Sequence, residues 1–241
     1  MITERFHGLE LALAGDSRSS ICYLLMPAEL PDAELQALDT VAHRFSVRIA
    51  VISGMDWNKD LTPWTAKGIR KKEPDFGGGA RIFLDELKEE VFPYIESGMS
   101  ANGLHRYLIG VSLSGLFAVW GLCSGLEMDG VCSISGSFWY DGFCEWLAQN
   151  STCVSGKRVC LLLGDREKAA RDARLASVES CTRAVCDTLA SAGADCSFEL
   201  VPGTHFSAIG PRLERAFELL FGLSMAMWIT TTTATLANIR S

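Results

Sequence analysis

Six short apolar runs, spaced along the chain, constrain its fold more than any other feature. Each is nearly continuous and rich in β-branched residues, as strands buried on both faces of a sheet are. The runs are residues 21–26, 47–52, 107–111, 130–134, 158–163 and 196–201. Helical patterns separate them, and strands joined through helices form right-handed crossovers. We therefore predict an α/β fold with a mostly parallel central sheet and helices on both faces.

The segments between the runs carry the expected helices, which are residues 32–45, 80–96, 116–123, 173–192 and 212–221. Pro31 is suited to open the first of them, and Pro93 is expected to kink or end the second. Residues 56–79 form a long connection for a compact domain, and connections of that length are usually functional or disordered. Ligands of parallel sheets gather at the carboxyl ends of the strands, so functional residues are expected just after the apolar runs.

The length and charge of the chain limit its organisation and its partners. With 241 residues and no Pro/Gly/Ser-rich linker, we expect a single domain over residues 1–222, followed by a threonine-rich tail at 223–241. The net charge of -7 argues against a nucleic-acid partner. Glu4 and Arg5 precede only a short apolar stretch, which predicts neither a signal peptide nor a membrane span, so a cytoplasmic protein is expected.

The cysteines are odd in number and scattered, mostly within apolar runs. They are Cys22, Cys123, Cys132, Cys144, Cys153, Cys160, Cys181, Cys186 and Cys196. This usage is typical of small buried hydrophobic residues in a reducing compartment. No C-x-x-C pair stands beside a histidine, so the sequence predicts no metal site, and no cofactor is expected.

The stretch IGVSLSGLFAVW, which begins at Ile109, departs at one position from the G-x-S-x-G elbow that presents a nucleophilic serine. Gly110 lies two residues before Ser112, and Ser114 stands where the second glycine is usual. Serine is only slightly larger than glycine, so the strained turn can survive. If Ser114 were the nucleophile, Leu116 would take the crowded position. Ser112 is therefore the predicted nucleophile, with a strand-to-helix turn without chemistry as the alternative.

Two further strand ends supply the partners that a serine nucleophile needs. Asp165 and Glu167 follow one apolar run and His205 follows the last, in the order serine, acid, histidine. An imidazole takes the hydroxyl proton, and a carboxylate fixes the imidazole tautomer. We predict His205 as the base and prefer Glu167 as the acid, while Asp165 stays open. The other histidines are less suitably placed; they are His7, His43 and His105.

Five segments match, in order, the motifs of a known family. They are Asp56–Pro63, Phe76–Ala80 followed by Pro93-Tyr94-Ile95, Gly110–Ala118, Ser135–Tyr140 and Gly203–Phe206. In these segments the chain resembles the putative esterase family of α/β hydrolases, which contains esterase D, enterochelin esterases and feruloyl esterases. The resemblance implies an α/β-hydrolase fold and a serine esterase that acts on a small-molecule ester through an acyl-enzyme. It also implies Glu167, at the fourth position of a G-x-x-[DE] turn, as the acid.

The chain departs from the family pattern at Ser114 and at Met26-Pro27-Ala28, where relatives often carry His-Gly or Asp-Gly. One donor to the oxyanion is predicted to be the backbone N–H of Leu113, the residue after the nucleophile. The second is expected from the loop after residues 21–26. Because Pro27 has no N–H, Ala28 is the predicted donor.

Aromatic residues near these motifs are candidates for a substrate pocket, with core packing as the alternative. They are Trp57, Trp64, Phe138, Trp139 and Tyr140. A basic run would either attract an anionic substrate or simply be solvated; it consists of Lys67, Arg70, Lys71 and Lys72. Two other functions stay open at this stage: acyl transfer to an alcohol, and a catalytically retired hydrolase fold that serves as a binding or scaffold protein.

Overall fold

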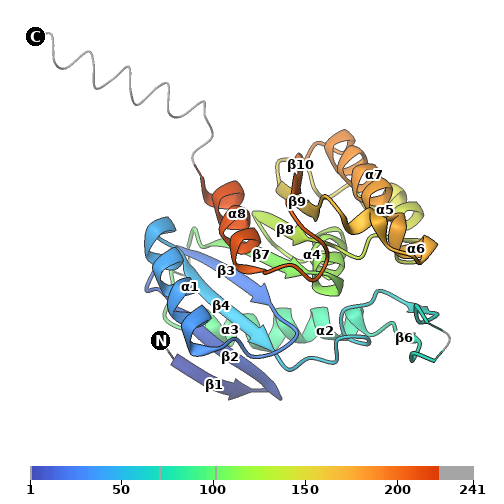
Figure 1. Cartoon of the computed structure of the whole chain (residues 1–241). Coiled ribbons are helices and arrows are strands. Elements are labelled where there is room, and N and C mark those ends of the chain that lie inside the picture. Colours follow the sequence, from blue (N-terminus) through green and yellow to red (C-terminus); the bar gives the residue numbers. More distant parts are fainter. Residues whose placement is uncertain (1, 71, 101, 223–241) are drawn as a thin grey trace, which may run out of the picture.

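An eight-stranded sheet forms the centre of the molecule, with the strand order β1-β2-β4-β3-β7-β8-β9-β10 (Figure 1). The strands are β1 (Ile2–Phe6), β2 (Leu9–Ala14), β3 (Ser20–Leu25), β4 (Arg48–Ser53), β7 (His105–Val111), β8 (Gly130–Ile134), β9 (Arg158–Gly164) and β10 (Asp195–Val201). The computed structural model describes residues 2–70, 72–100 and 102–222. The tail expected at 223–241 lies outside the described residues, and a single domain over residues 1–222 stays a prediction.

The six predicted apolar runs are the six parallel strands, from β4 through β3 and β7 to β10. The prediction of a mostly parallel sheet is therefore confirmed. Two strands at one edge were not predicted, because β1 and β2 form an antiparallel hairpin that carries charged residues among its apolar ones. His7 and Gly8 turn this hairpin with φ angles of 52° and 82°, as a tight two-residue hairpin turn requires.

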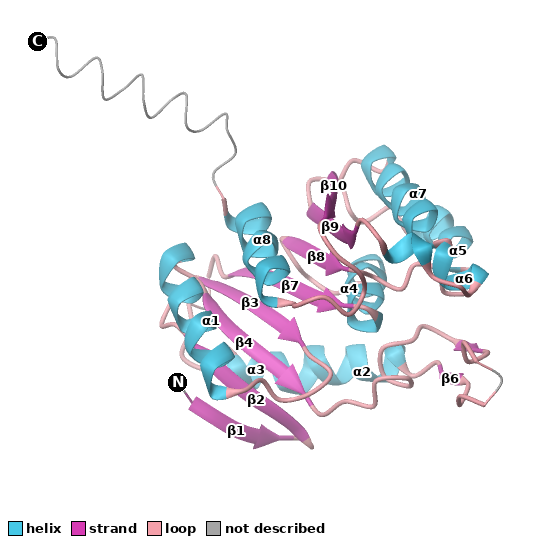
Figure 2. Cartoon of the chain, viewed as in Figure 1, coloured by secondary structure: helices cyan, strands magenta, loops and turns pink. Residues whose placement is uncertain are grey.

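Helices cover both faces of the sheet (Figure 2). Two of them, α1 (Asp32–Phe45) and α8 (Gly210–Phe221), pack on one face. The other face is covered by α2 (Ala80–Glu86), α3 (Phe92–Ile95), α4 (Leu113–Cys123), α5 (Phe143–Asn150) and α7 (Val178–Ser191). Short elements complete the chain: β5 (Thr65–Ala66), β6 (Phe76–Gly77), the 3-10 turn η2 (Glu167–Ala169) and α6 (Ala173–Ala176). Among the described residues, no helix combines the length and the hydropathy that a membrane crossing needs.

The helix expected at residues 80–96, which Pro93 was expected to kink or end, is interrupted just before this proline. A π-helical turn, η1 (Leu87–Val91), follows α2, and the helical chain then continues through Pro93 to Ile95. Proline lacks the N–H that bonds the preceding turn, and its ring crowds the carbonyl four residues earlier. The wider π turn just before the proline accommodates the missing hydrogen bond and the crowded carbonyl, as such turns commonly do.

The cysteines are free thiols whose burial varies: Cys22, Cys132 and Cys160 are buried, whereas Cys153 is exposed and the others are intermediate. The prediction that the cysteines are small buried hydrophobic residues is therefore right for these three, which lie on strands of the sheet.

The parallel register of the sheet also has a functional consequence. The carboxyl ends of β7, β8, β9 and β10 meet at one edge, so the residues that follow these strands lie together.

Candidate active site

The turn between β7 and α4 places Ser112 in an uncommon backbone conformation. Its φ and ψ are 57° and -117°, which a residue with a side chain adopts only at a cost in strain. A Cβ atom at Gly110 would collide with the carbonyl oxygen of Ser114, so the turn needs glycine there. Helix α4 begins at Leu113, three residues earlier than expected, directly after the serine. This geometry exposes the Ser112 side chain at the end of the sheet.

Ser114, which stands where the elbow pattern has glycine, is fully buried. Its Oγ accepts a hydrogen bond from the Val111 N–H at 2.7 Å and lies 2.9 Å from the carbonyl oxygen of Leu25, to which it can donate. The tight contact between α4 and β8 falls instead on Gly115, where a Cβ atom would come within 2.6 Å of Ser133 Oγ. Ser114 thus ties the elbow to β3, and its hydroxyl points away from the site.

Glu167 and His205 form a close pair after β9 and β10. Glu167 Oε2 lies 2.9 Å from His205 Nδ1, and the carboxylate side chain is only 3% exposed. Asp165, the other candidate, is half exposed and accepts a hydrogen bond from the Gly203 N–H at 2.9 Å. Of the two carboxylates, the one that contacts the imidazole is Glu167, whereas Asp165 caps the turn before His205.

The second oxygen of Glu167 is held by neighbours that sequence reasoning missed. Glu167 Oε1 accepts hydrogen bonds from Ser135 Oγ at 2.6 Å and from the Gly164 N–H at 2.8 Å. Burial by itself would raise the pKa of Glu167, but the hydrogen bonds from His205, Ser135 and Gly164 outweigh it and hold the pKa below its usual range. The carboxyl group is therefore kept as a carboxylate.

A buried arginine, Arg212, lies behind this carboxylate in the first turn of α8. Its Nη1 donates to Ser135 Oγ at 2.9 Å and lies 3.4 Å from Glu167 Oε1, and its Nη2 donates to the Thr204 carbonyl at 2.6 Å. The residue is only 4% exposed. A sequence signal existed: Arg212 stands next to Leu213 on the apolar side of an amphipathic helix, where a charge needs a partner.

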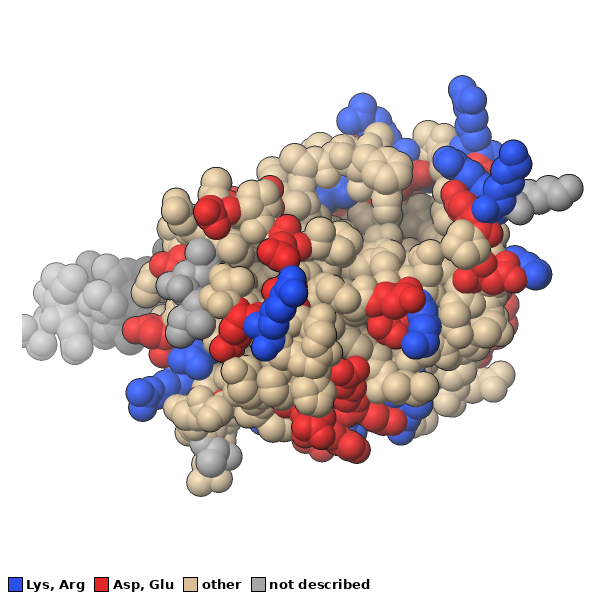
Figure 3. Space-filling view, turned by 90° about the horizontal axis from the view of Figure 1, so that it is seen from below, with Lys and Arg blue, Asp and Glu red and all other residues tan. Residues whose placement is uncertain are grey.

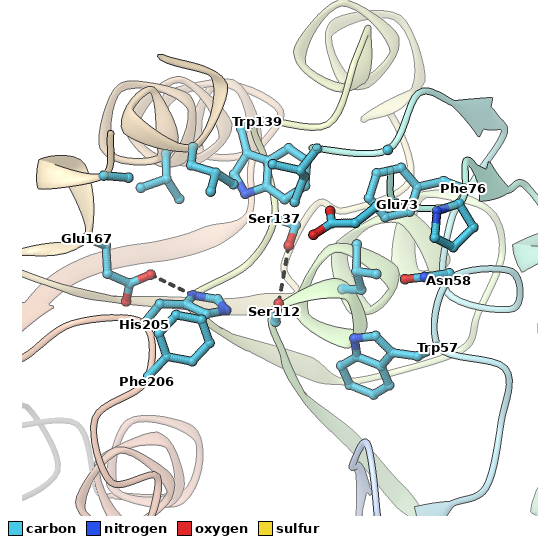
Figure 4. Close-up of a pocket in the computed structure, with 17 residues that line it drawn as sticks. Trp57, Asn58, Glu73, Phe76, Ser112, Ser137, Trp139, Glu167, His205 and Phe206 are labelled. Atoms are coloured by element: carbon cyan, nitrogen blue, oxygen red, sulfur yellow. Dashed lines mark hydrogen bonds and ion pairs between the residues drawn. The ribbon is translucent and has the colours of Figure 1, made fainter. Parts of the chain in front are cut away.

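Ser112 itself is not hydrogen-bonded to the imidazole. Within the part of the chain that the structure describes, its Oγ pairs with Ser137 Oγ at 3.4 Å and makes no hydrogen bond with His205. Figure 4 shows the imidazole between Glu167 and Ser112, with the ring nitrogen that is not bonded to Glu167 turned toward Ser112.

A cavity of about 410 Å³ opens above these residues. Ser112, Leu113, Glu167 and His205 line it together with aromatic side chains, which are Trp57, Phe76, Trp139 and Phe206. The long connection at 56–79 supplies much of the wall, including Asn58, Ile69 and Glu73. The connection is thus part of a ligand-sized pocket with an apolar lining.

Four residues predicted for the oxyanion hole or the substrate pocket do not line the cavity: Ala28, Trp64, Phe138, which is buried in the core, and Tyr140. Tyr140 is buried, and its hydroxyl donates to the Trp64 carbonyl, while Trp64 Nε1 donates to the Asp141 carbonyl at 2.9 Å. These two aromatic residues pack behind the wall because their polar atoms find partners there. Ala28 is exposed, since the chain leaves the sheet after β3 and runs outward to α1.

Of the basic run beside the cavity, Lys67 and Arg70 are paired with carboxylates, whereas Lys72 has no ion pair among the described residues. Lys67 Nζ lies 2.7 Å from Asp75, and Arg70 Nε lies 3.6 Å from Glu73. Lys71 lies outside the described residues. On the face seen in Figure 3, acidic and basic side chains stand next to one another rather than in a field of one sign. These residues are therefore not an uncompensated cationic patch.

The comparisons with known proteins decide the family. A family model described as putative esterase matches residues 34–208, well over half of the chain. The chain belongs to the putative esterase family. The matched segment contains Ser112, Glu167 and His205 and ends before Arg212. The α/β-hydrolase fold that the sequence motifs predicted is thereby confirmed.

Individual proteins are similar to parts of this chain that differ in length. An uncharacterized protein, YbbA of Bacillus subtilis (strain 168), is 31% identical over 111 residues, which are 45% of this chain and 44% of that protein. The chain thus spans less than half the length of that curated relative.

Solved structures share the fold. An IroE-like serine hydrolase from Shewanella oneidensis superposes with a TM-score of 0.72 at 21% identity, covering 88% of this chain and 75% of that one. The siderophore hydrolase EstA from Aspergillus nidulans does so with a TM-score of 0.66 at 23% identity, covering 90% of both chains.

Proposed function

We propose that this esterase cleaves its ester through an acyl-enzyme, with Ser112 as nucleophile, His205 as general base and acid, and Glu167 as the orienting carboxylate. The observation that carries the proposal is the 2.9 Å contact between Glu167 Oε2 and His205 Nδ1, in a cavity that also exposes Ser112 on a strained turn. The contact leaves the Nε2 edge of the ring free to accept a proton from the serine.

In the first half-reaction, Ser112 Oγ attacks the carbonyl carbon of the ester and transfers its proton to His205 Nε2. The tetrahedral intermediate carries its negative charge on the former carbonyl oxygen. When it collapses, the bond to the alcohol oxygen breaks, and that oxygen takes the proton from His205. In the second half-reaction, a water molecule gives a proton to His205 and attacks the acyl carbon. The bond to Ser112 Oγ then breaks, Ser112 takes the proton from His205, and the carboxylic acid product leaves.

Stabilisation of the oxyanion is assigned to the beginning of α4. As the first helical residue, Leu113 has an N–H that no carbonyl of its own helix accepts, and Leu113 lines the cavity beside Ser112. Ala28 is exposed and away from the cavity, so the loop after β4 is the better source of a second donor. Trp57 and Asn58 from that loop line the cavity, and both side chains carry N–H groups.

The apolar lining favours esters whose acyl or alcohol part is apolar or aromatic. Trp57, Phe76, Trp139 and Phe206 offer ring faces around Ser112, and such rings bind planar apolar groups. Hydrolases named for siderophores are among the similar structures, so siderophore esters belong in a substrate screen beside aryl and short alkyl esters.

Labelling with a fluorophosphonate tests the proposal, because this probe reacts with an activated serine. We expect one label per chain, mapped to Ser112 by fragmentation of the tryptic peptide that also contains Ser114 and Ser137. Ser112→Ala should abolish both labelling and hydrolysis of p-nitrophenyl esters. Ser114→Gly is the matched control and should keep both. A label on Ser137, or esterase activity that survives in Ser112→Ala, would overturn the assignment.

A further inference from the structure

Arg212 joins the three strand ends that build the acid side of the site. Its guanidinium contacts Ser135 after β8, Glu167 after β9, and the Thr204 carbonyl after β10, at 2.9, 3.4 and 2.6 Å. Thr204 directly precedes His205 in the chain. A single planar group therefore spans the segments that carry the acid and the base of the proposed triad, although it does not line the substrate cavity.

Two glycines lie directly against this guanidinium. A Cβ atom at Gly164 would lie 2.9 Å from Arg212 Nη2, and one at Gly203 would lie 3.0 Å from it. Gly203 also has a φ of 126°, which residues with a side chain rarely adopt. Both glycines belong to the turns that precede the acid and the base, so the arginine is built into these turns.

The charge of Arg212 is costly to bury unless it is compensated, and a carboxylate supplies the compensation. Arg212 and Glu167 are 4% and 3% exposed, respectively, in their side chains. In so dry an environment an ion pair interacts strongly, and removal of either partner leaves an uncompensated charge. The arrangement thus places a permanent cation on one oxygen of Glu167 and the imidazole on the other.

We propose that Arg212 is a positioning residue of this esterase: its guanidinium fixes the acid loop against the histidine loop, and its charge moderates how strongly Glu167 attracts a proton to His205. This inference rests on the proposed function, because it uses Glu167 and His205 in their triad roles. The two effects are separable, since lysine keeps the charge without the planar fork, whereas glutamine removes the charge.

Among the described residues, the other charged side chains near the pair have partners; Glu73, which lines the cavity with His205, lies 3.6 Å from Arg70 Nε. Arg166 Nε lies 3.8 Å from Asp165, and Lys168 Nζ lies 2.9 Å from Glu179. Arg212 is therefore the charge that acts directly on Glu167. Without it, the carboxylate itself and the imidazole beside it both bind a proton more readily. Each change moves the acidic limb of the kcat/KM profile to higher pH.

The test is the pH profile of ester hydrolysis in Arg212 variants. For Arg212→Gln we expect kcat to fall about 10- to 100-fold and the acidic limb to move up by about 0.5 to 1 pH unit, with KM little changed. For Arg212→Lys we expect kcat to fall about 3- to 10-fold while the limb stays where it is in the wild type.

Arg215, one turn further along the same helix, provides the matched control. It pairs with Glu199 and Glu218 at the surface, so Arg215→Gln should change neither kcat nor the limb. A purely structural role for Arg212 predicts lower thermal stability in its variants with an unmoved limb, and that result would overturn the inference. A limb that moves equally in the lysine variant would overturn it as well, because the shift would not follow the charge.

Two further measurements keep the test decisive. If Arg212→Gln does not fold, Ser135→Ala removes a neutral hydroxyl that bridges Arg212 and Glu167; a kcat lowered about 3-fold or more at constant KM supports the inference, and an unchanged kcat opposes it. Fluorophosphonate labelling separates the two proposals. Absence of a label on wild-type Ser112 sinks the proposed function, whereas normal labelling with an unmoved limb in Arg212→Gln sinks only the role of Arg212.

Discussion

The two sides of the cavity differ in how tightly their side chains are hydrogen-bonded. On the acid side, Glu167 is 3% exposed, and its oxygens have neighbours at 2.6 to 3.4 Å that belong to three strand ends and to α8. On the serine side, the Ser112 hydroxyl faces the cavity and has one hydrogen-bond partner among the described residues, Ser137 Oγ, at 3.4 Å. Hydroxyl pairs of normal strength are about 2.7 to 2.8 Å apart, so the serine is held weakly.

This difference corresponds to what each side must do in the proposed reaction. A carboxylate that orients a base acts best when its position is fixed before the reaction begins. A nucleophile has to turn between the base and the substrate, so a strong hydrogen bond to a third group would oppose its motion. Changes on the acid side should therefore damage preorganisation, whereas changes around the serine should matter only when they touch Ser112 itself.

The largest effect should come from Ser112→Ala, the sharpest test of the loosely bonded side. Removal of the nucleophile should lower kcat/KM by about 10⁴-fold or more, with the fold unchanged. The assay is hydrolysis of a short p-nitrophenyl ester, accompanied by circular dichroism. Wild-type activity in this variant would mean that another group attacks the ester.

The second-largest loss of activity is expected when the charge of Glu167 is removed. Glu167→Gln should lower kcat by about 10²- to 10⁴-fold with little change in KM, because the orienting charge is used mainly in the transition state. Asp165→Asn is the matched control and should cost less than about 10-fold, since Asp165 caps the Gly203 N–H rather than contacting His205. Reversed effects in steady-state kinetics would exchange the two assignments.

The hydrogen-bonded carboxylate of Glu167 should also stabilise the fold, by an amount that depends on pH. Because the folded state lowers the pKa of Glu167, its contribution is present above the pKa of the unfolded chain and is lost as the pH falls through the lower folded value. The difference in Tm between wild type and Glu167→Gln should be widest near neutral pH and shrink below about pH 4. Thermal unfolding between pH 3 and 7 measures it; a constant difference would contradict the lowered pKa.

A smaller effect is expected on the serine side from Ser137→Ala. The Ser137 hydroxyl makes only a long contact with Ser112, so its removal should change kcat/KM by less than about 3-fold. The same ester assay detects this. A loss as large as that of Ser112→Ala would show that Ser137 takes part in the chemistry and that the two sides are more alike than their hydrogen bonds indicate.

The smallest effect on activity should come from Ser114→Gly, which restores the common elbow pattern. We expect kcat to stay within about 2-fold, while loss of the buried hydrogen bonds to the Val111 N–H and the Leu25 carbonyl costs roughly 1 to 2 kcal/mol of stability and lowers Tm by several degrees. Ser114→Ala should lose the same stability, because it too lacks the hydroxyl. Loss of activity in both variants would bring Ser114 into the reaction.

Local patterns predicted the parts of the fold that depend on nearby residues. Apolar runs such as 130–134 are buried on both faces, so composition alone marks them as parallel strands, and the helix at 32–45 was predicted with its observed ends. The hairpin of β1 and β2 was missed because an edge strand mixes charged and apolar residues. The π turn before Pro93 was missed because proline offers several ways to disturb a helix and packing selects one.

The sequence by itself determined which strand ends carry Ser112, Glu167 and His205, because each side chain follows an apolar run and chain order is visible without coordinates. Only the tertiary structure decided which carboxylate meets the imidazole, since Asp165 and Glu167 are two residues apart and the turn directs one of them inward. It also placed Trp64 and Tyr140 behind the cavity wall and Arg212 behind Glu167. Such contacts join residues far apart in the chain, and local propensity carries no information about them.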